Sequence, residues 1–326
     1  MRFILIIFLL AAQLNFSQTF IDENGIPRDT SFTVYSAYQK IRNEFPEATI
    51  AEPILPDGVV EGKNIAYSSI GNRELHLDIF YPESNKSKLL PIVILIHGGG
   101  WRSGDKSMNV PMAQRIALNE FVTATIEYRL SPEAKYPASV YDIKSAIRWI
   151  RANAIRYNID TNKIAILGCS SGAQLATLVG MTNGLEKFEG EGINKIFGSN
   201  IQAIINIDGI VEFTSEEALK YEDDPKKNPS AAGQWFGGTY NEKLELWKEA
   251  SPLFYVNQYS PPIIFINSSL LRFHCGRDEM IAKLNEYEIY SEVHTVPDTP
   301  HPFWLFHPWF DCTNNLIVNF LNKIWK

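Results

Sequence analysis

A serine stands between two glycines at residues 168–172, in the run Gly-Cys-Ser-Ser-Gly whose centre is Ser170. Apolar residues 164–167 lead into this run, and residues 173–179 have the composition of a helix. A strand, a tight turn and a helix in this order present a serine hydroxyl for nucleophilic attack. The flanking glycines keep the turn free of side chains that would collide with the strand or the helix. Ser170 is therefore the candidate nucleophile.

A glycine run follows a second apolar strand upstream. Residues 92–96 are apolar, and His-Gly-Gly-Gly-Trp follows at residues 97–101. Glycines here let backbone N–H groups turn towards an oxyanion, the charge that forms when a nucleophile attacks a carbonyl. His97 is interpreted as a brace for these glycines. The two motifs, in this order and each at a strand end, predict the α/β-hydrolase fold.

A serine hydroxyl is a weak nucleophile at neutral pH, so it needs a base, and the base needs an orienting acid. In the predicted fold the base comes last, on the loop after the final strand. Residues 291–296 form the final predicted strand, and His301 follows it. His301 is therefore the candidate base and His307 the fallback, whereas His294 lies within the strand.

The elements that must position these residues alternate between strands and helices. An antiparallel pair comes first and β–α units follow, which implies a mostly parallel eight-stranded sheet with helices on both faces. Residues 212–255 interrupt the alternation and are interpreted as a small insertion over the carboxyl ends of the strands, where ligands bind in open sheets. The expected strands are residues 64–68, 74–81, 91–96, 121–128, 164–167, 201–207, 262–266 and 291–296, and the expected helices are 34–44, 111–118, 140–153, 173–179 and 314–324.

The first residues are typical of an export signal. A basic start is followed by an apolar stretch, residues 3–12, that is too short to span a bilayer. We expect residues 1–17 to be a signal peptide, residues 18–62 an N-terminal extension packed on the body, and residues 63–326 the hydrolase domain. No cysteine follows the apolar stretch. A secreted or periplasmic protein is therefore expected, without a lipid anchor and without membrane insertion after signal cleavage.

Composition argues against several other classes of protein. The formal net charge is −7 and no run of Lys or Arg is longer than two residues, which argues against a nucleic-acid partner. The three cysteines are too few for a disulfide scaffold. Cys169 is interpreted as a small packing residue, and a disulfide bridge between Cys275 and Cys312 is left as an alternative. No Cys/His cluster has metal-ligand spacing, and no cofactor is expected.

Four further groups of residues accompany the two motifs, namely Gly104-Asp105-Lys106, Glu127-Tyr128-Arg129-Leu130-Ser131, Tyr136-Pro137-Ala138, and Asp142 with Ala146-Ile147-Arg148-Trp149. Together they resemble the α/β-hydrolase esterases of the hormone-sensitive-lipase and bacterial feruloyl-esterase-like (carbohydrate esterase) branch, over roughly residues 64–310. The resemblance implies that the backbone N–H groups of Gly99, Gly100 and Ser171 form the oxyanion hole. Tyr128, Arg129 and Asp142 are interpreted as structural residues beside the glycine run.

The acid departs from the pattern of this branch. Relatives usually carry it shortly after the strand that corresponds to residues 262–266, whereas Ser269 stands near that position here. Asp208, at the end of the preceding strand, and Asp278, at an expected helix start where the helix dipole stabilises a carboxylate, are the two replacements. We prefer Asp208, because a strand-end residue points towards the nucleophile turn. Asp278 is the rival, and a weakened or absent acid is the third alternative.

Basic and aromatic residues surround the expected site. Arg272, His274 and Arg277 lie in the loop that lacks the acid, and they are either solvated charges or contacts to an anionic or polyhydroxyl ligand. Most aromatic residues of this region are expected to pack in the core, but Trp101 and Trp304 are candidates for a wall against an acyl group or a sugar ring. The candidate substrate-binding residues are Trp101, Arg272, His274 and Trp304.

These observations predict an exported serine carboxylesterase that works through an acyl-enzyme. The resemblance implies a decorated polysaccharide or its oligosaccharides as the substrate and acetyl as the acyl group. A feruloyl-type aromatic acyl group is the alternative. A non-catalytic sugar-binding relative of the fold is the alternative from another class, and a peptidase is a further one. The oligomeric state does not follow from the sequence.

Overall fold

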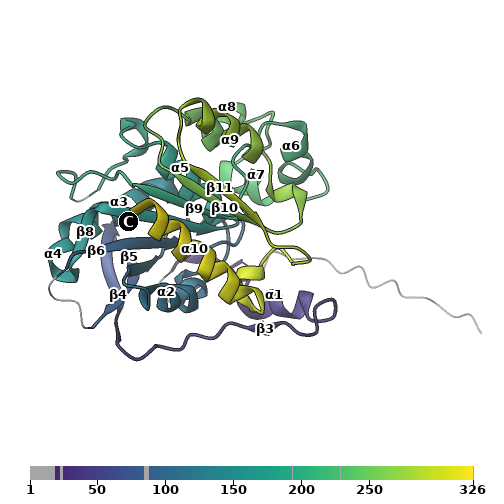
Figure 1. The fold of residues 1–326 in the computed structure, drawn as a ribbon. Helices are drawn as coiled ribbons and strands as arrows, with labels where there is room; N and C mark the ends of the chain where they lie inside the picture. The colour runs from purple at the N-terminus through teal and green to yellow at the C-terminus, as the bar shows by residue number, and fades with distance from the viewer. Residues whose placement is uncertain (1–18, 23–24, 84–87, 193, 228, 326) are drawn as a thin grey trace, which may run out of the picture.

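The computed structural model describes residues 19–22, 25–83, 88–192, 194–227 and 229–325. Eight strands in these ranges form one sheet in the order β11-β10-β9-β8-β6-β7-β5-β4 (Figure 1). The strands from β11 to β7 are parallel neighbours, and β5 pairs antiparallel with β7 and with β4, which confirms the predicted mostly parallel sheet. The strands are β4 (Val59–Ile70), β5 (Arg73–Pro82), β6 (Leu90–Ile96), β7 (Val122–Ile126), β8 (Ile159–Cys169), β9 (Ala203–Ile207), β10 (Ile263–Asn267) and β11 (Ser291–Thr295).

The central strands are apolar along their whole length because both faces of the sheet are covered. On β6, Ile92, Ile94 and Ile96 belong to one apolar core, whereas Val93 and Leu95 belong to the other. Successive side chains of a strand point to opposite faces, so a continuous apolar run fills both cores at once. The uninterrupted hydrophobic runs of the sequence are therefore the strands with helices on each side.

Four helices make up most of this cover. Helices α3 (Ala138–Ala152) and α5 (Ser171–Met181) contribute to the core that contains Ile94, and α2 (Val110–Ala117) and α10 (Trp309–Trp325) contribute to the other. Figure 1 shows α10, in yellow, crossing in front of the sheet. The shorter elements are α1 (Val34–Ile41), α4 (Ala154–Tyr157), α6 (Glu216–Glu222), α7 (Ala231–Phe236), α8 (Leu244–Glu249), α9 (Arg277–Glu286), and the 3₁₀ turns η1 (Lys106–Asn109), η2 (Glu186–Phe188), η3 (Pro252–Tyr255), η4 (Leu271–Phe273) and η5 (Phe303–Leu305).

Residues 212–255, the predicted insertion, hold α6, α7, α8 and η3 in place of a simple strand-to-helix connection. Two of its residues, Glu222 at the end of α6 and Ala231 at the start of α7, line a cavity that also contains Ser170. The aromatic ring of Trp235 stacks on Trp101 with 5.0 Å between the ring centroids. This segment therefore lies beside the expected site.

The N-terminal segment packs against the end of the chain. Its short strand β3 (Thr49–Ile50) pairs antiparallel with β12 (Phe306–His307), and α1 lies where a helix was expected. Strands β1 (Thr19–Ile21) and β2 (Pro27–Asp29) form a separate hairpin. Strand β4 begins at Val59, inside the predicted extension, because the first strand of the sheet is longer than its alternating pattern indicated.

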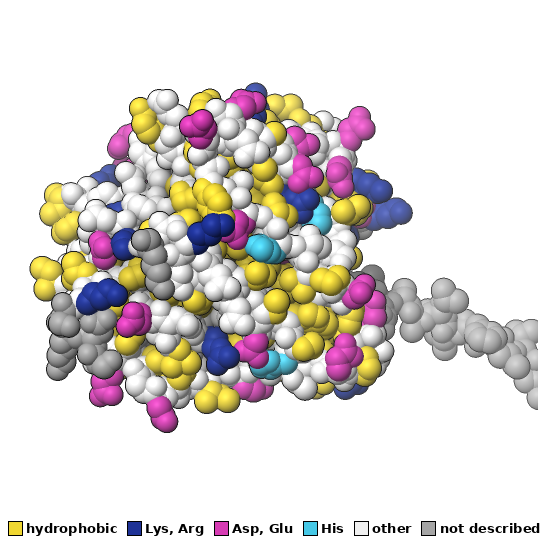
Figure 2. All heavy atoms as spheres, in the orientation of Figure 1, with side chains coloured by type: hydrophobic (Ala, Val, Ile, Leu, Met, Phe, Trp, Pro, Cys, Tyr) yellow, Lys and Arg dark blue, Asp and Glu magenta, His cyan; other side chains and the backbone are white. Residues whose placement is uncertain are grey.

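The expected signal peptide, residues 1–17, lies outside the described residues. Among the residues that are described, no helix is long and apolar enough to cross a membrane. On the face shown in Figure 2, acidic and basic side chains are interspersed, with hydrophobic side chains between them.

A buried ion pair links the end of β7 to α3. The Asp142 side chain is 2% exposed, and it accepts hydrogen bonds from the backbone N–H, Nε and Nη2 of Arg129 at 2.9, 2.9 and 2.8 Å. A bidentate guanidinium–carboxylate pair of this kind fixes the position of α3 relative to the segment that follows β7. Residues Arg129 and Asp142 therefore brace the helix against the sheet.

We predict that Asp142→Ala lowers the free energy of unfolding by roughly 2–4 kcal/mol, because the change leaves the Arg129 charge without its buried partner. The figure lies below that for a fully buried pair since the Arg129 side chain is 20% exposed. Urea unfolding followed by circular dichroism measures the loss. Glu191→Ala, which removes an exposed pair with Lys195, is the control and should leave the unfolding midpoint unchanged. An equal effect of both variants would contradict the bracing role.

Candidate active site

Ser170 lies in a sharp turn between β8 and α5. Its backbone has φ 54° and ψ −122°, and a positive φ is rare for a residue other than glycine. The flanking glycines are required by close packing. A Cβ atom on Gly168 would lie 2.0 Å from the carbonyl oxygen of Gly172, and one on Gly172 would lie 2.3 Å from that of Ile96. The turn therefore fixes the Ser170 hydroxyl at the carboxyl end of β8.

The structure brings Ser170, His301 and Asp208 into one chain of hydrogen bonds. His301 Nε2 lies 2.8 Å from Ser170 Oγ, and His301 Nδ1 lies 2.7 Å from Asp208 Oδ2. A carboxylate only accepts hydrogen bonds, so Nδ1 carries the hydrogen and donates to Asp208. Nε2 is then the atom that accepts from the Ser170 hydroxyl. This is the arrangement of a nucleophile, its base and an orienting acid.

The Asp208 carboxylate is fully buried and has several donors. Oδ1 accepts from the backbone N–H of Ser268 at 2.9 Å, and Oδ2 accepts from the Ser268 hydroxyl at 2.6 Å. The Asn267 side-chain amide lies 3.4 Å from Oδ1. Asn267 ends β10, and Ser268 follows it, one residue before the Ser269 position at which the acid was expected. The end of β10 therefore holds in place the carboxylate that follows the neighbouring strand β9.

The rival acid, Asp278, is turned away from His301. Its carboxylate accepts from Arg277 Nε at 2.8 Å, and its side chain is 76% exposed. It lies in the first turn of α9, where a carboxylate is stabilised by the helix dipole. Arg277 also lowers the pKa of Asp278. Geometry therefore places Asp208, and not Asp278, against the candidate base.

The glycine run lies directly beside Ser170. Gly99 has φ 124° and Gly100 has φ 61°, conformations that favour glycine. A Cβ atom on Gly98 would lie 2.8 Å from the carbonyl oxygen of Cys169. The carbonyl oxygen of Gly99 accepts from the Ser103 hydroxyl at 2.7 Å, which ties the run down from behind.

His97 braces this run, as expected from its position. Its Nδ1 lies 2.8 Å from the carbonyl oxygen of Gly98, and its ring stacks on Tyr128 with 4.5 Å between the centroids. The Tyr128 hydroxyl donates to the carbonyl oxygen of His97 at 2.8 Å. Burial lowers the pKa of His97, so the ring stays neutral in this setting.

Two cavities meet at Ser170, and both include His301 and Gly100. The larger has a volume of about 240 Å³, and polar side chains line part of it: Gln174, Glu222 and Arg272. The smaller has a volume of about 60 Å³, and its apolar walls come from Phe32, Met108, Trp304 and Leu305. Glu222 and Ala231 of the α6–α7 segment line the first cavity, and Phe32 of the N-terminal segment lines the second. An ester whose carbonyl group lies at Ser170 would therefore have its acyl part and its alcohol part in different surroundings.

Three of the four candidate substrate-binding residues line these two cavities. Trp101 and Arg272 lie in the larger one, and Trp304 in the smaller one. Trp101 is 4% exposed, and its Nε1 donates to Gln174 Oε1 at 2.9 Å, so most of its ring packs in the core. Ser171, the first residue of α5, also lines the larger cavity.

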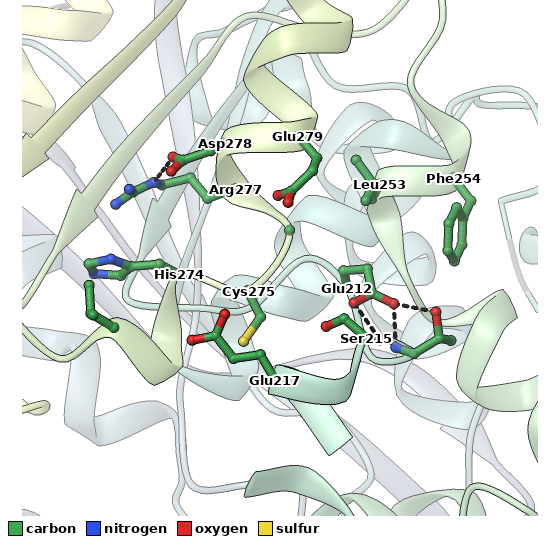
Figure 3. Close-up of a pocket in the computed structure, with 13 residues that line it drawn as sticks. Glu212, Ser215, Glu217, Leu253, Phe254, His274, Cys275, Arg277, Asp278 and Glu279 are labelled. Carbon is green, nitrogen blue, oxygen red and sulfur yellow. Dashed lines mark hydrogen bonds and ion pairs between the residues drawn. The ribbon is translucent and has the colours of Figure 1, made fainter. Parts of the chain in front are cut away.

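His274, the fourth candidate, lies outside both cavities. Its Nε2 lies 3.0 Å from the carbonyl oxygen of Ser268. Figure 3 shows His274 with Arg277 and Asp278 around a separate cavity of about 480 Å³. The expected role of His274 in the Ser170 cavity is therefore corrected. Arg272 and Phe273 of the loop line the cavity of Ser170, whereas Leu271 and His274 line the separate one.

Sequence reasoning missed Phe273, which covers one face of the candidate base. Its ring stacks on the His301 ring with 3.5 Å between the centroids and an interplanar angle of 8°. Trp304 meets the same ring edge-on at 5.2 Å. A single aromatic residue in a loop gives no signal of such a contact. Ser268 was also missed, although its place at the end of β10, beside the expected acid position, was a usable signal.

Burial lowers the pKa of His301 below its ordinary value, although the Asp208 carboxylate raises it. Desolvation disfavours the charged imidazolium, while a hydrogen-bonded carboxylate favours it. Burial outweighs the carboxylate here. His301 is therefore neutral, and able to accept a proton, at neutral pH.

The cysteines are free thiols. Cys169 and Cys275 are buried and Cys312 is exposed, so the bridge between Cys275 and Cys312 that the sequence left open does not form in this structure. Cys169 packs beneath the turn, and burial raises the pKa of its thiol well above the usual value. Over the described ranges, no group of three or more His, Cys, Asp or Glu residues is arranged to hold a metal ion.

We predict that Asp208→Asn slows covalent labelling of Ser170 by a fluorophosphonate probe by up to about 10⁴-fold. The amide would hold the imidazole in the wrong tautomer and would remove the charge that stabilises imidazolium. The second-order rate constant of labelling measures the effect. Asp278→Asn is the matched control and should label at the rate of the unaltered protein. A slow Asp278→Asn variant beside a normal Asp208→Asn variant would reverse the assignment.

The lowered pKa of His301 sets the pH dependence of this reaction. Only the neutral imidazole activates Ser170, so a lowered pKa extends reactivity to more acidic solutions. We predict that the acid limb of the labelling rate has its midpoint below about 6.5, the ordinary histidine value. Rates measured through the acidic range test this. A midpoint at or above that value would show that Asp208 outweighs burial.

Comparisons with known proteins agree with this geometry. The family model described as BD-FAE matches residues 77–281, which is more than half of the chain. Esterase LipC of Mycobacterium tuberculosis is 27% identical over 197 residues, which cover 59% of this chain and 47% of LipC. The chain spans about half the length of the curated relatives it matches.

Solved structures of other proteins share the fold, and two are described here. The bifunctional GH43-CE protein of Bacteroides eggerthii superposes with a TM-score of 0.71 at 26% identity, over 82% of this chain and 38% of that one. A truncated form of a carbohydrate esterase from gut microbiota also gives a TM-score of 0.71, at 24% identity, over 83% of this chain and 100% of that one. The resemblance drawn from the sequence motifs is thereby confirmed. The chain belongs to the BD-FAE family of α/β-hydrolase-fold esterases.

Proposed function

We propose that this protein is an exported serine carboxylesterase that removes acetyl groups from a decorated polysaccharide or its oligosaccharides. The observation that carries the proposal is the hydrogen-bonded chain from Asp208 through His301 to Ser170, set beside the glycine run. A non-catalytic sugar-binding protein has no use for an activated serine, so this chain favours an enzyme.

The proposed reaction proceeds through an acyl-enzyme. His301 Nε2 accepts the hydroxyl proton while Ser170 Oγ bonds to the ester carbonyl carbon. The backbone N–H groups of Gly99, Gly100 and Ser171 hold the negative charge that develops on the carbonyl oxygen. His301 then gives the proton to the leaving alcohol oxygen as the C–O bond breaks. Water repeats these steps on the acyl-enzyme, releases the acid and restores Ser170.

The two cavities support a short acyl group over a long alkyl chain. The smaller cavity, about 60 Å³, has no room for such a chain behind Met108, Trp304 and Leu305. In the larger cavity an alkyl chain would displace water from Glu222 and Arg272 without replacing their hydrogen bonds, which is unfavourable. An acetyl group meets neither obstacle.

A carbohydrate substrate is supported by the polar wall of the larger cavity. Glu222 and Arg272 offer an acceptor and donors to hydroxyl groups. Two structural neighbours point the same way, since one is named a carbohydrate esterase and the other a GH43-CE protein. Export is supported by the basic start and apolar residues 3–12, and N-terminal sequencing of the mature protein would test it.

A feruloyl-type esterase is the second candidate. The larger cavity, about 240 Å³, is favourable for an aromatic acyl group because Trp101 and Phe273 lie in its wall. Hydrolysis of methyl ferulate at a rate above that of acetyl esters would favour this candidate over the first.

We predict that p-nitrophenyl acetate is hydrolysed at least about tenfold faster than the octanoate, because the smaller cavity has no room for the longer chain and the larger one would place it against Glu222 and Arg272. The ratio of kcat/KM for the two esters measures this. Ser170→Ala should lose at least about 10³ in kcat for both, since it removes the covalent nucleophile. A preference for the octanoate would contradict the acetyl assignment, and an active Ser170→Ala variant would contradict the acyl-enzyme.

A further inference from the structure

A charged pair lies in the same cavity as the reactive serine, and it takes no part in the acyl-transfer steps proposed above. Glu222 ends α6, and Arg272 lies in the 3₁₀ turn η4 after β10. Arg272 Nη2 lies 3.2 Å from Glu222 Oε1. Both residues line the larger cavity together with Ser170 and His301. A substrate whose ester group lies at Ser170 therefore has this pair among its surroundings.

The pair is held in a fixed position. The Glu222 side chain is 11% exposed, and burial raises the pKa of Glu222 although Arg272 opposes the shift. The guanidinium group of Arg272 lies over the rings of Phe273 and Tyr221, at 4.6 and 5.1 Å from their centroids. Cation–π contacts on two rings restrict the orientation of an arginine side chain. The donors and acceptors of the pair are therefore pre-organised.

The pair still has hydrogen-bonding capacity. In the described part of the chain, the buried Nε of Arg272 has no hydrogen-bond partner. A carboxylate also accepts more hydrogen bonds than the one that Arg272 donates here. The Arg272 side chain is 35% exposed, so its guanidinium group and the Glu222 carboxylate can both form further hydrogen bonds with a ligand in the cavity.

The charges of the pair select the chemistry of that ligand. An anionic group next to Arg272 would also face the Glu222 carboxylate, and a cationic group next to Glu222 would face the guanidinium. A neutral hydroxyl group suits both, because it donates to the carboxylate and accepts from the guanidinium. The pair also lies close to the candidate base, because the Phe273 ring contacts both the Arg272 guanidinium group and the His301 ring.

We propose that Glu222 and Arg272 form a subsite for a hydroxyl group on a neutral ring of the substrate, and that the ring is a sugar. This proposal rests on the proposed esterase function, and it adds that Glu222 and Arg272 select substrates that carry a ring hydroxyl group. A phenolic acyl group carries the same hydroxyl chemistry, so the experiment must distinguish these two sources.

The test compares esters with and without ring hydroxyl groups. The first comparison is acetylated xylo-oligosaccharide against p-nitrophenyl acetate, and the second comparison is methyl ferulate against methyl cinnamate. The variants are Glu222→Gln and Arg272→Met. Glu217→Gln is the matched control, because Glu217 lies on the same helix but lines the separate cavity of Figure 3. Melting temperatures verify that the variants fold.

For both variants, kcat/KM for the sugar ester should fall at least about tenfold further than kcat/KM for p-nitrophenyl acetate, mainly through KM. Glu217→Gln should leave this ratio unchanged. If the ratio of ferulate to cinnamate collapses instead, the subsite is supported and its hydroxyl belongs to a phenolic acyl group. If both ratios match the control, the subsite is overturned while the esterase function stands. If the unaltered protein hydrolyses none of these esters, the esterase function fails and the subsite fails with it.

Discussion

The buried Asp208 carboxylate is the constraint on which the rest of the site depends. A charge without solvent is stable only when hydrogen bonds replace the lost water. Ser268, Asn267 and His301 supply those bonds, so the position of the carboxylate fixes the position and the tautomer of the imidazole ring. The hydroxyl of Ser170 is then aligned by the remaining ring nitrogen.

The parallel sheet makes this arrangement geometrically simple. Strands β10, β9 and β8 are neighbours, and their carboxyl ends lie at the same edge. Ser268, Asp208 and Ser170 each follow one of these ends. The glycine run follows β6 on the other side of β8, and His301 follows β11. Residues far apart in sequence thus meet because parallel strands align their ends.

The surroundings of Ser170 come from irregular segments and not from the sheet. Ala231 and Glu222 of the α6–α7 segment lie on one side, and Phe32 of the N-terminal segment lies on the other. The sheet fixes the positions of Ser170, Asp208 and His301, because each of them follows the end of a strand and their hydrogen bonds tolerate only small displacements. The two segments set the volume and polarity of the cavities. Substrate choice can therefore change in this architecture while the reacting atoms stay in place.

The sequence by itself determined the features that rest on local patterns. Apolar runs gave the strands, and steric demands at Gly168 and Gly172 identified the nucleophile turn at Ser170. Chain order in this fold identified His301. Tertiary structure decided what depends on contacts between distant residues. Asp208 lies 93 positions from His301, and their 2.7 Å contact, with Ser268 bonded to the carboxylate, decides for Asp208 over Asp278. The orientation of His274 and the stacking of Phe273 on His301 were likewise decided in three dimensions, because side-chain direction within an irregular loop follows from packing and not from residue type.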